Sequence, residues 1–359
     1  MKIAIDKNSL NVPFNDDDDY VYLFDDEKLD DLLKTKQHCL YYKLCNYVDI
    51  NLSRFDIPCI KKANLKDNNW HDLPQLSMKK IGIIVPNYNY EHTIEKCLNS
   101  IFNQTYKNYE IIFVDDCSTD NSIDVAQTTY LKYCARELGK SKVDSEWAEL
   151  PKNFKLVRLK QKRLNGGARN EGYLHLSDDV DYVYYVDSDD WLQNENALRD
   201  INVKLQNNPD VLFVSINSYK NGVESQCITP SYIDKYQAML GWSGSCGKVI
   251  KKELATRQDC LYAEGTLKED RNQHRRICIN MKTFNILEKP VYVWNQDNHK
   301  SITTIREKVL WGTSTIRQYA DTLQLYLSVK GVDKQVDRIL EESLKLCKEE
   351  VLNDGDKQY

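Results

Sequence analysis

From Lys80 onward, apolar and polar positions follow a pattern that predicts alternating strands and helices. Short apolar runs, too short for helices, predict buried strands at 81–85, 110–114, 154–159 and 181–186. Apolar residues at helical spacing predict helices between them, at 91–102, 119–138 and 166–176. Ser118 or Thr119 is expected to cap the second of these helices. The alternation predicts an α/β fold with a Rossmann-like, mostly parallel sheet flanked by helices.

The segments before and after this region are organised differently. Residues 1–78 lack the βα periodicity; a strand at 20–24, a helix at 28–46 and then a linker are expected there. Further along, the pattern predicts a helix at 195–206, a strand at 211–216, a helix at 269–281 and a strand at 286–294. Pro290 puts that last strand near a sheet edge. A pair of helices, 305–328 and 333–352, closes the chain.

Three parts are therefore expected. These are an N-terminal accessory segment (1–78), a central domain (79–304) and a C-terminal helical extension (305–359). The central domain divides into a first half at 79–220 and a second half at 221–304.

Composition narrows the class of protein. The 359 residues are 41% hydrophobic and 29% charged, as in a soluble globular protein. A net charge of −5 and the lack of a basic stripe argue against general nucleic-acid binding. Eleven singly spaced cysteines suggest reduced thiols in a cytoplasmic protein. No window is apolar enough for a transmembrane segment, which leaves a peripheral membrane contact open.

The run 182–186 ends abruptly in Asp187, Ser188, Asp189 and Asp190. Carboxylates two positions apart, with a small residue between them, can present oxygens to one hard divalent cation. Asp and Ser also favour ordinary turns, so the run by itself leaves both interpretations open.

Polar residues also follow the other predicted strands. Ligands of open parallel sheets bind at the carboxyl ends of the strands, so these residues are expected to meet. They are Pro86 and Tyr88 after the first strand, Asp115 and Asp116 after the second, and Asn165, Gly166, Gly167 and Arg169 after the third. An aromatic ring, a carboxylate, a glycine-rich helix start and an acid pair together suit a nucleotide diphosphate with a cation. The chain has no GxxxxGK[ST] or GxGxxG motif, which weighs against a P-loop kinase or a dinucleotide enzyme.

Three blocks in order carry a specific resemblance: IGIIVPNYNYEHTIEKCLNSIFNQTYKNYEIIFVDDCSTDNS, NGGARNEG and DYVYYVDSDDW. Over roughly residues 79–220 the chain resembles glycosyltransferase family 2, inverting enzymes of the GT-A fold. The later GSCGKVIKKEL, LKEDRNQHRR and NHKSIT resemble the family's more variable second half. The resemblance implies metal-dependent transfer of one sugar from a nucleotide-sugar donor, most simply a UDP-sugar, to an acceptor hydroxyl, with Mn²⁺ or Mg²⁺ as cofactor.

The resemblance also assigns donor-site roles. Pro86 and Tyr88 would lie beside the base, although Tyr88 could instead be a core or loop aromatic. Asp116 would accept from the base N–H, and Asn165 and Gly166 would lie near the base and diphosphate. Arg169 would either contact phosphate or form an ion pair within the protein. Asp187, with Ser188, would face the donor ribose or sugar, and Asp189 would bind the metal.

On the acceptor side, the resemblance makes Asp270 of the Glu269-Asp270 pair the catalytic base, with Glu269 beside the acceptor. Such pairs are also ordinary dipole partners at helix starts. Trp242 would pack against the acceptor or belong to the core. His299 would complete the metal ligands or be an exposed loop histidine.

Two further classes and one related activity compete with this interpretation. QHRRI at 273–277 departs from the QxxRW of processive synthases and follows the acid pair directly, so single-sugar transfer is expected. A sugar nucleotidyltransferase needs a glycine-rich basic loop after the first strand, which PNYNYEH lacks. A non-catalytic nucleotide-sugar-binding protein remains the third alternative. The acceptor is left as a glycan, a lipid-linked sugar or another hydroxyl compound.

Overall fold

The computed structural model describes residues 78–139, 153–297 and 308–356, together with the backbone of three short strands nearer the N-terminus. These strands, β1 (Lys2–Asp6), β2 (Tyr20–Leu23) and β3 (Cys39–Tyr41), form a parallel sheet in the order β2-β1-β3. β2 confirms the strand expected at 20–24. The helix expected at 28–46 is wrong where β3 lies, because Cys39–Tyr41 pairs with the distant β1. The expected linker lies outside the described residues.

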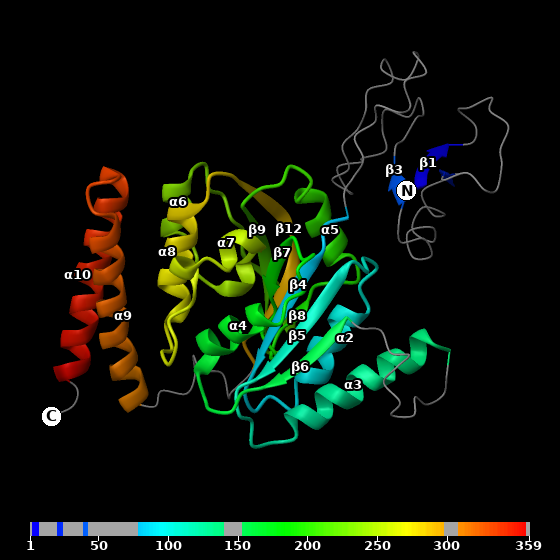
Figure 1. Ribbon diagram of the computed structural model, residues 1–359, viewed down its shortest axis with the longest axis horizontal. Coiled ribbons are helices and arrows are strands. Elements are labelled where there is room, and N and C mark those ends of the chain that lie inside the picture. Colours follow the sequence, from blue (N-terminus) through cyan, green and yellow to red (C-terminus); the bar gives the residue numbers. More distant parts are fainter. Residues whose placement is uncertain are drawn as a thin grey trace, which may run out of the picture.

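A nine-stranded sheet forms the centre of the described chain, in the order β6-β5-β4-β7-β11-β9-β12-β8 with β10 on β9 (Figure 1). β4 to β7 are parallel, whereas β11 runs antiparallel to both β7 and β9. The α/β prediction is confirmed, and the sheet is more mixed than expected because β11 lies between its halves. The strands are β4 (Ile81–Asn87), β5 (Tyr109–Asp115), β6 (Phe154–Arg158), β7 (Tyr182–Tyr185), β8 (Trp191–Leu192), β9 (Val211–Lys220), β10 (Val223–Ile228), β11 (Lys248–Lys251) and β12 (Phe284–Asn295).

Helices cover both faces of this sheet, and every helix predicted after Lys80 is present with its ends shifted by a few residues. They are α2 (Ile94–Phe102), α3 (Ser122–Glu137), α4 (Leu164–Leu174), α5 (Ala197–Lys204), α6 (Lys235–Leu240), α7 (Lys252–Ala255), α8 (Glu269–Asn280), α9 (Lys308–Val329) and α10 (Lys334–Asp356). Ile81, Ile83 and Val85 of β4 face the core beneath α2 and α3. Ile84 points to the opposite core, beneath α4 and α8. Covering on both faces explains why β4, β5 and β7 are buried along their whole length.

Two local predictions need correction or qualification. Neither Ser118 nor Thr119 caps α3, which begins at Ser122; the Ser118 hydroxyl instead accepts from Asn87 Nδ2 and Asn89 N–H. Ser118 thereby joins the ends of two neighbouring strands. Pro290 does lie near an edge, since β12 is followed only by the two-residue β8, and the β9 pairing shifts register on either side of it.

The C-terminal helices α9 and α10 form the predicted pair and lie beside α8 (Figure 1). Buried residues of both helices, among them Leu325 and Leu340, join the core that also contains Ile277 and Cys278 of α8. This pair therefore shares a core with the central sheet.

Candidate active site

The first part of the site is a hydrogen-bonded junction at the carboxyl ends of β4 and β5. Asp115 is fully buried and accepts from Asn87 Nδ2 at 3.0 Å and from Ser118 N–H at 3.0 Å. Its carboxylate is therefore occupied with holding the two strand ends together. Pro86 is also buried, within β4 opposite Val114, so it shapes the strand end below Tyr88.

Asp116 anchors the turn that leads into α4. Its two carboxylate oxygens accept from the backbone N–H groups of Arg163 at 2.6 Å and Leu164 at 2.8 Å. Burial raises the pKa of Asp116 even though these two bonds oppose the shift. Each oxygen keeps a second lone pair that can accept from a ligand N–H.

Tyr88 follows β4, and its ring is covered by a cation that sequence reasoning missed. Lys162 Nζ lies 3.4 Å from the ring centroid of Tyr88, a cation–π arrangement. Lys162 is exposed and also acts to lower the pKa of Asp116. The basic run 160–163, two residues before the glycine pair, was the available signal for a cation beside the expected nucleotide.

The start of α4 comes unusually close to the loop before α8. A Cβ on Gly166 would lie 2.4 Å from the carbonyl oxygen of Ala263 and 3.2 Å from Glu269 Cβ. Any larger residue would push the two segments apart, so Gly166 lets α4 approach α8. Asn165, in the same turn, is partly exposed.

Arg169 of α4 joins the two halves of the site. Its guanidinium donates to Asp187 at 2.7 Å and to Glu269 at 2.7 Å, and the residue is only 3% exposed. Of the two roles considered for Arg169, the structure contains the ion pair within the protein. The acid-rich end of β7 and the start of α8 are thus connected through one buried side chain.

The acid cluster after β7 is a turn whose carboxylates have different surroundings. Asp190 N–H donates to the Asp187 carbonyl oxygen, and the buried Asp190 carboxylate accepts from Tyr292 Oη at 2.6 Å and Asn295 N–H at 2.8 Å. Burial, followed by the charges of Asp189 and Asp187, raises the pKa of Asp190 well above its usual range. Asp187 and Asp189 are partly exposed, whereas Ser188 is buried. Asp190 therefore fixes the turn, while Asp187 and Asp189 remain partly exposed.

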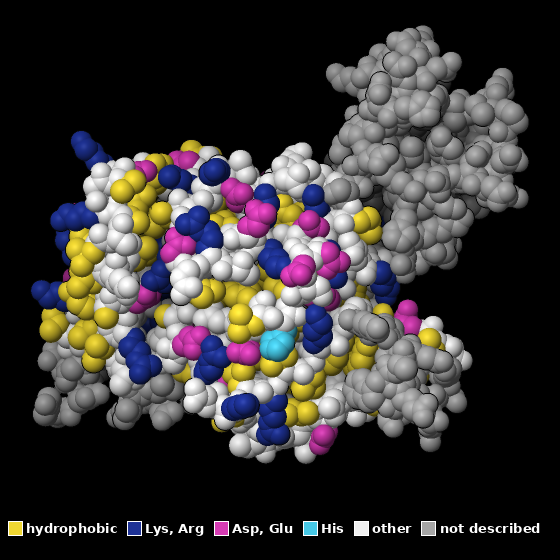
Figure 2. Space-filling view, in the orientation of Figure 1, with side chains coloured by type: hydrophobic (Ala, Val, Ile, Leu, Met, Phe, Trp, Pro, Cys, Tyr) yellow, Lys and Arg dark blue, Asp and Glu magenta, His cyan; other side chains and the backbone are white. Residues whose placement is uncertain are grey.

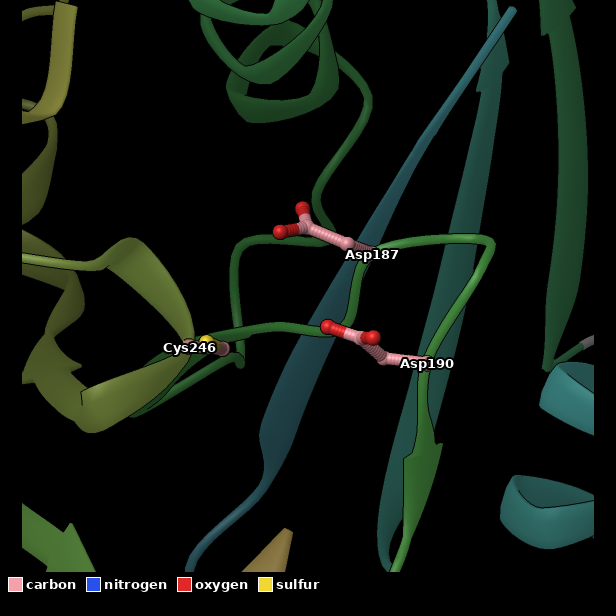
Figure 3. Close-up of side chains that lie close together, drawn as sticks. All are labelled: Asp187, Asp190 and Cys246. Carbon is pink, nitrogen blue, oxygen red and sulfur yellow. The ribbon is translucent and has the colours of Figure 1, made fainter. Parts of the chain in front are cut away.

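Asp187, Asp190 and Cys246 form a group that could hold a metal ion (Figure 3). Each offers one possible ligand atom, and these atoms lie within 4.8 Å of one another. Burial and the two carboxylates raise the pKa of the Cys246 thiol well above its usual range, so the sulfur is protonated. A neutral thiol is a poor ligand for a hard cation. The carboxylate oxygens of Asp187 and Asp189 fit Mg²⁺ or Mn²⁺ better. His299 lies outside the described residues.

The candidate base, Asp270, lies in the first turn of α8 and is partly exposed. Ser243 Oγ donates to Asp270 Oδ2 at 3.3 Å. The neighbouring Glu269 is buried, and its hydrogen bond from Arg169 fixes the position of its carboxylate. Burial raises the pKa of Glu269 to about 7, against the opposing effect of Arg169.

A buried lysine supports the loop that carries Ser243. Lys248 is inaccessible to solvent, and its ammonium donates to the carbonyl oxygens of Ser243 at 2.7 Å and Gly244 at 2.8 Å. Burial lowers the pKa of Lys248 to about 8. The half-buried Trp242 packs over Gly244, where a Cβ would lie 2.2 Å from its ring. Trp242 therefore shapes its own loop, and a contact with the acceptor stays a prediction.

Residues 82–237 match the model described as glycosyl transferase family 2. This segment is a family 2 glycosyltransferase domain. Its relatives include "Glycosyltransferase GlyA" of Streptococcus pneumoniae, 36% identical over 116 residues that make up 32% of this chain and 14% of that protein. The "Poly(ribitol-phosphate) beta-glucosyltransferase" of Bacillus spizizenii is 34% identical over 134 residues, 37% of this chain and 18% of that protein. The chain thus spans less than a fifth of the length of these two relatives.

Two further comparisons cover more of the chain. The Escherichia coli "UDP-Glc:alpha-D-GlcNAc-diphosphoundecaprenol beta-1,3-glucosyltransferase WfgD" is 29% identical over 172 residues, 47% of this chain and 59% of that protein. The crystal structure of Staphylococcus aureus TarS residues 1–349 with UDP-GlcNAc matches with a TM-score of 0.57 at 19% identity. That match covers 78% of this chain and 73% of the TarS chain, and it confirms the GT-A fold.

Two observations describe the surface and the helices of the chain. Basic and acidic side chains are interspersed over the face shown in Figure 2. Among the described residues, no helix combines the length and apolar character needed to cross a membrane.

Proposed function

We propose that this chain is a metal-dependent, inverting glycosyltransferase that moves one sugar from a UDP-sugar to an acceptor hydroxyl. The observation that carries this proposal is the pair of ion pairs made by Arg169. Through Arg169, the acids expected to face the donor are joined to α8, the helix that bears the expected base. A donor site and a base on one connected framework are what a single displacement requires.

In the donor site, Tyr88 and Asp116 would hold the base, and Lys162 and the start of α4 would lie along the diphosphate. Asp187 would face the donor ribose or sugar, and Asp189, with His299 as the expected second protein ligand, would hold Mn²⁺ or Mg²⁺. The cation would balance the charge that develops on the departing diphosphate. Oxygen ligands on a strand end suit such a cation.

In the transfer step, the acceptor oxygen forms a bond to the anomeric carbon as the bond from that carbon to the diphosphate oxygen breaks. The electron pair of the broken bond leaves with the nucleoside diphosphate. Asp270 takes the hydroxyl proton, and Ser243 orients its carboxylate. Inversion agrees with the "beta" products in the names of two relatives, one of which is named for UDP-Glc, an α-linked donor.

The acceptor is proposed only as a hydroxyl compound. The relatives are named for poly(ribitol-phosphate) and for a diphosphoundecaprenol-linked sugar. A glycan, a polyol phosphate or a lipid-linked sugar would each supply the required hydroxyl.

The test is to measure UDP release from UDP-glucose and UDP-N-acetylglucosamine, with Mn²⁺ or with EDTA, in the wild type and in Asp270→Asn. Metal-dependent release that falls by about 10²-fold or more in Asp270→Asn, with UDP affinity unchanged, is expected from loss of a positioned base. Ser243→Ala should have a smaller effect, since the carboxylate remains. Full activity of Asp270→Asn would overturn the mechanism. Binding without any turnover would favour the non-catalytic alternative, and sugar-1-phosphate-dependent release of pyrophosphate from added UTP would favour the nucleotidyltransferase.

A further inference from the structure

The first turn of α8, which carries Glu269 and Asp270, is held from the outside by the C-terminal helices (Figure 1). Lys268, the residue before this turn, makes no capping hydrogen bond to it. The Lys268 ammonium instead donates to Glu350 of α10 at 2.7 Å and to Thr315 of α9 at 3.2 Å. Its side chain is 8% exposed, so these contacts replace solvent around a charged group.

Glu350 also binds the residue on the other side of the acid pair. Arg271 Nη1 lies 3.1 Å from Glu350 Oε1. One carboxylate of α10 therefore contacts both Lys268 and Arg271, the two residues that flank Glu269 and Asp270. Burial raises the pKa of Glu350, but its two cationic partners outweigh burial and keep that pKa below its usual value.

Helix α9 adds hydrogen bonds on either side of the same acid pair. Leu267 N–H donates to Ser314 Oγ at 3.1 Å, and Asn272 Nδ2 donates to Asp321 at 2.8 Å. Ser314 and Asn272 are both almost completely buried. Together with Glu350, these contacts bind α8 on both sides of its acid pair.

Apolar packing alone would bury α8 without fixing its rotation, because hydrophobic contacts are not directional. The side chains of an α-helix project outward from its axis, with successive residues about 100° apart. A rotation of α8 about its axis would therefore swing Asp270 away from an acceptor oxygen. Hydrogen bonds to charged partners have defined geometry and resist such a rotation. Because these hydrogen bonds are concentrated at residues 267–272, the C-terminal helices resist rotation of α8 as well as covering it.

We infer that the α9–α10 pair is part of the catalytic apparatus, and that Glu350 is a positioning residue which orients Asp270 through Lys268 and Arg271. This inference rests on the proposed function. It assigns a role to a segment that lies outside residues 82–237, the part matched by the family model.

The decisive variant is Glu350→Ala in the full chain, assayed by Mn²⁺-dependent hydrolysis of UDP-glucose or UDP-N-acetylglucosamine, which needs no added acceptor. Turnover per UDP-binding site should fall by about tenfold with KM for the donor unchanged, since a misplaced base lowers the rate and leaves donor binding intact. Glu350→Gln, which keeps the shape and one acceptor oxygen, should fall less. The matched control is Arg338→Gln, which removes an exposed ion pair with Glu342 on the same helix and should leave turnover unchanged.

A merely structural role for Glu350 would lower the unfolding temperature and the number of UDP-binding sites but not the turnover per site. The second test places Glu350→Ala in the Asp270→Asn background. If Glu350 acts through Asp270, Glu350→Ala should not lower turnover further in this background. If the two residues act independently, their fold-reductions in turnover would multiply. Ser314→Ala, which acts from α9, should also lower turnover with unchanged UDP affinity.

The inference is overturned if the wild type hydrolyses donor and Asp270→Asn is impaired while Glu350→Ala matches the Arg338→Gln control. It is equally overturned if Glu350→Ala keeps its full effect in the Asp270→Asn background. Absence of donor turnover in the wild type would remove the proposed function, and the inference with it.

Discussion

The guanidinium of Arg169 lies 2.7 Å from a carboxylate oxygen of Glu269, one hundred positions away in the sequence, and both side chains are buried. The same guanidinium also holds Asp187. Two carboxylates can be bridged in this way because the planar guanidinium offers several donors in fixed directions. A lysine ammonium carries the same charge but cannot reproduce this geometry.

Arg169→Lys should therefore impair both stability and transfer. A single ammonium would leave one of the two carboxylates without a partner, and a buried unpaired group costs on the order of 1–3 kcal/mol. We expect that loss in the free energy of unfolding, measured by urea denaturation, and a fall of about tenfold or more in UDP-sugar turnover.

The stability control for this variant is Arg163→Lys. Arg163 also bridges two carboxylates, Glu264 and Glu171, but its side chain is 26% exposed. Exposed ion pairs contribute about 0–1 kcal/mol, so this variant should lose little stability. Equal losses in the two variants would show that burial does not set the strength of the Arg169 bridge.

Asp189 and Asp190 are neighbours, yet their substitutions should have different effects. Asp189→Asn should weaken the extra thermal stabilisation that Mn²⁺ gives in the presence of UDP, because it removes a charged oxygen ligand. Asp190→Asn should mainly lower stability, by about 1–3 kcal/mol, since one of its buried hydrogen-bond acceptors becomes a donor. Melting curves with UDP and Mn²⁺, UDP alone and buffer separate the two effects. An unchanged Mn²⁺ response in Asp189→Asn would remove that residue from the metal site.

Sequence reasoning succeeded where the signal was local. The run 182–186 was expected as a buried strand ending in acids, and Tyr182–Tyr185 is indeed a strand buried along its whole length. Buried strands and amphipathic helices show in consecutive residues, so their positions from Lys80 onward could be predicted. The alternation of β and α also gave the fold class, because parallel strands need crossover helices.

The remaining features depend on partners far apart in the chain. The two roles of Arg169 could not be separated because Glu269 is one hundred positions away. The helix expected at 28–46 was wrong at Cys39–Tyr41, because β3 pairs with β1 and the leucine spacing does not indicate that partner. The contacts of Glu350 with Lys268 and Arg271 likewise arise only when α10 docks on α8. Local sequence patterns do not indicate which residues that are far apart in the chain will be in contact.

The burial of Lys248 predicts a specific pH dependence of stability. Its pKa of about 8 in the folded protein is lower than the ordinary value of 10.5, so the unfolded chain binds more protons between these values. The contribution of Lys248 to the free energy of unfolding should therefore rise as pH increases through this window. Between about pH 7 and pH 9.5 the gain should be about 2 kcal/mol.

Lys248→Met isolates this contribution, because all other titrating groups are shared with the wild type. The stability of the wild type relative to Lys248→Met, measured by urea denaturation, should increase from about pH 7 to about pH 9.5. The variant also leaves the carbonyl oxygens of Ser243 and Gly244 without their donor, so the loop that brings Ser243 to Asp270 should loosen and donor turnover should fall. A difference in stability that is independent of pH would mean that the Lys248 ammonium is not desolvated in the folded protein. In that case its bonds to the loop would compete with water and could not hold Ser243 in place.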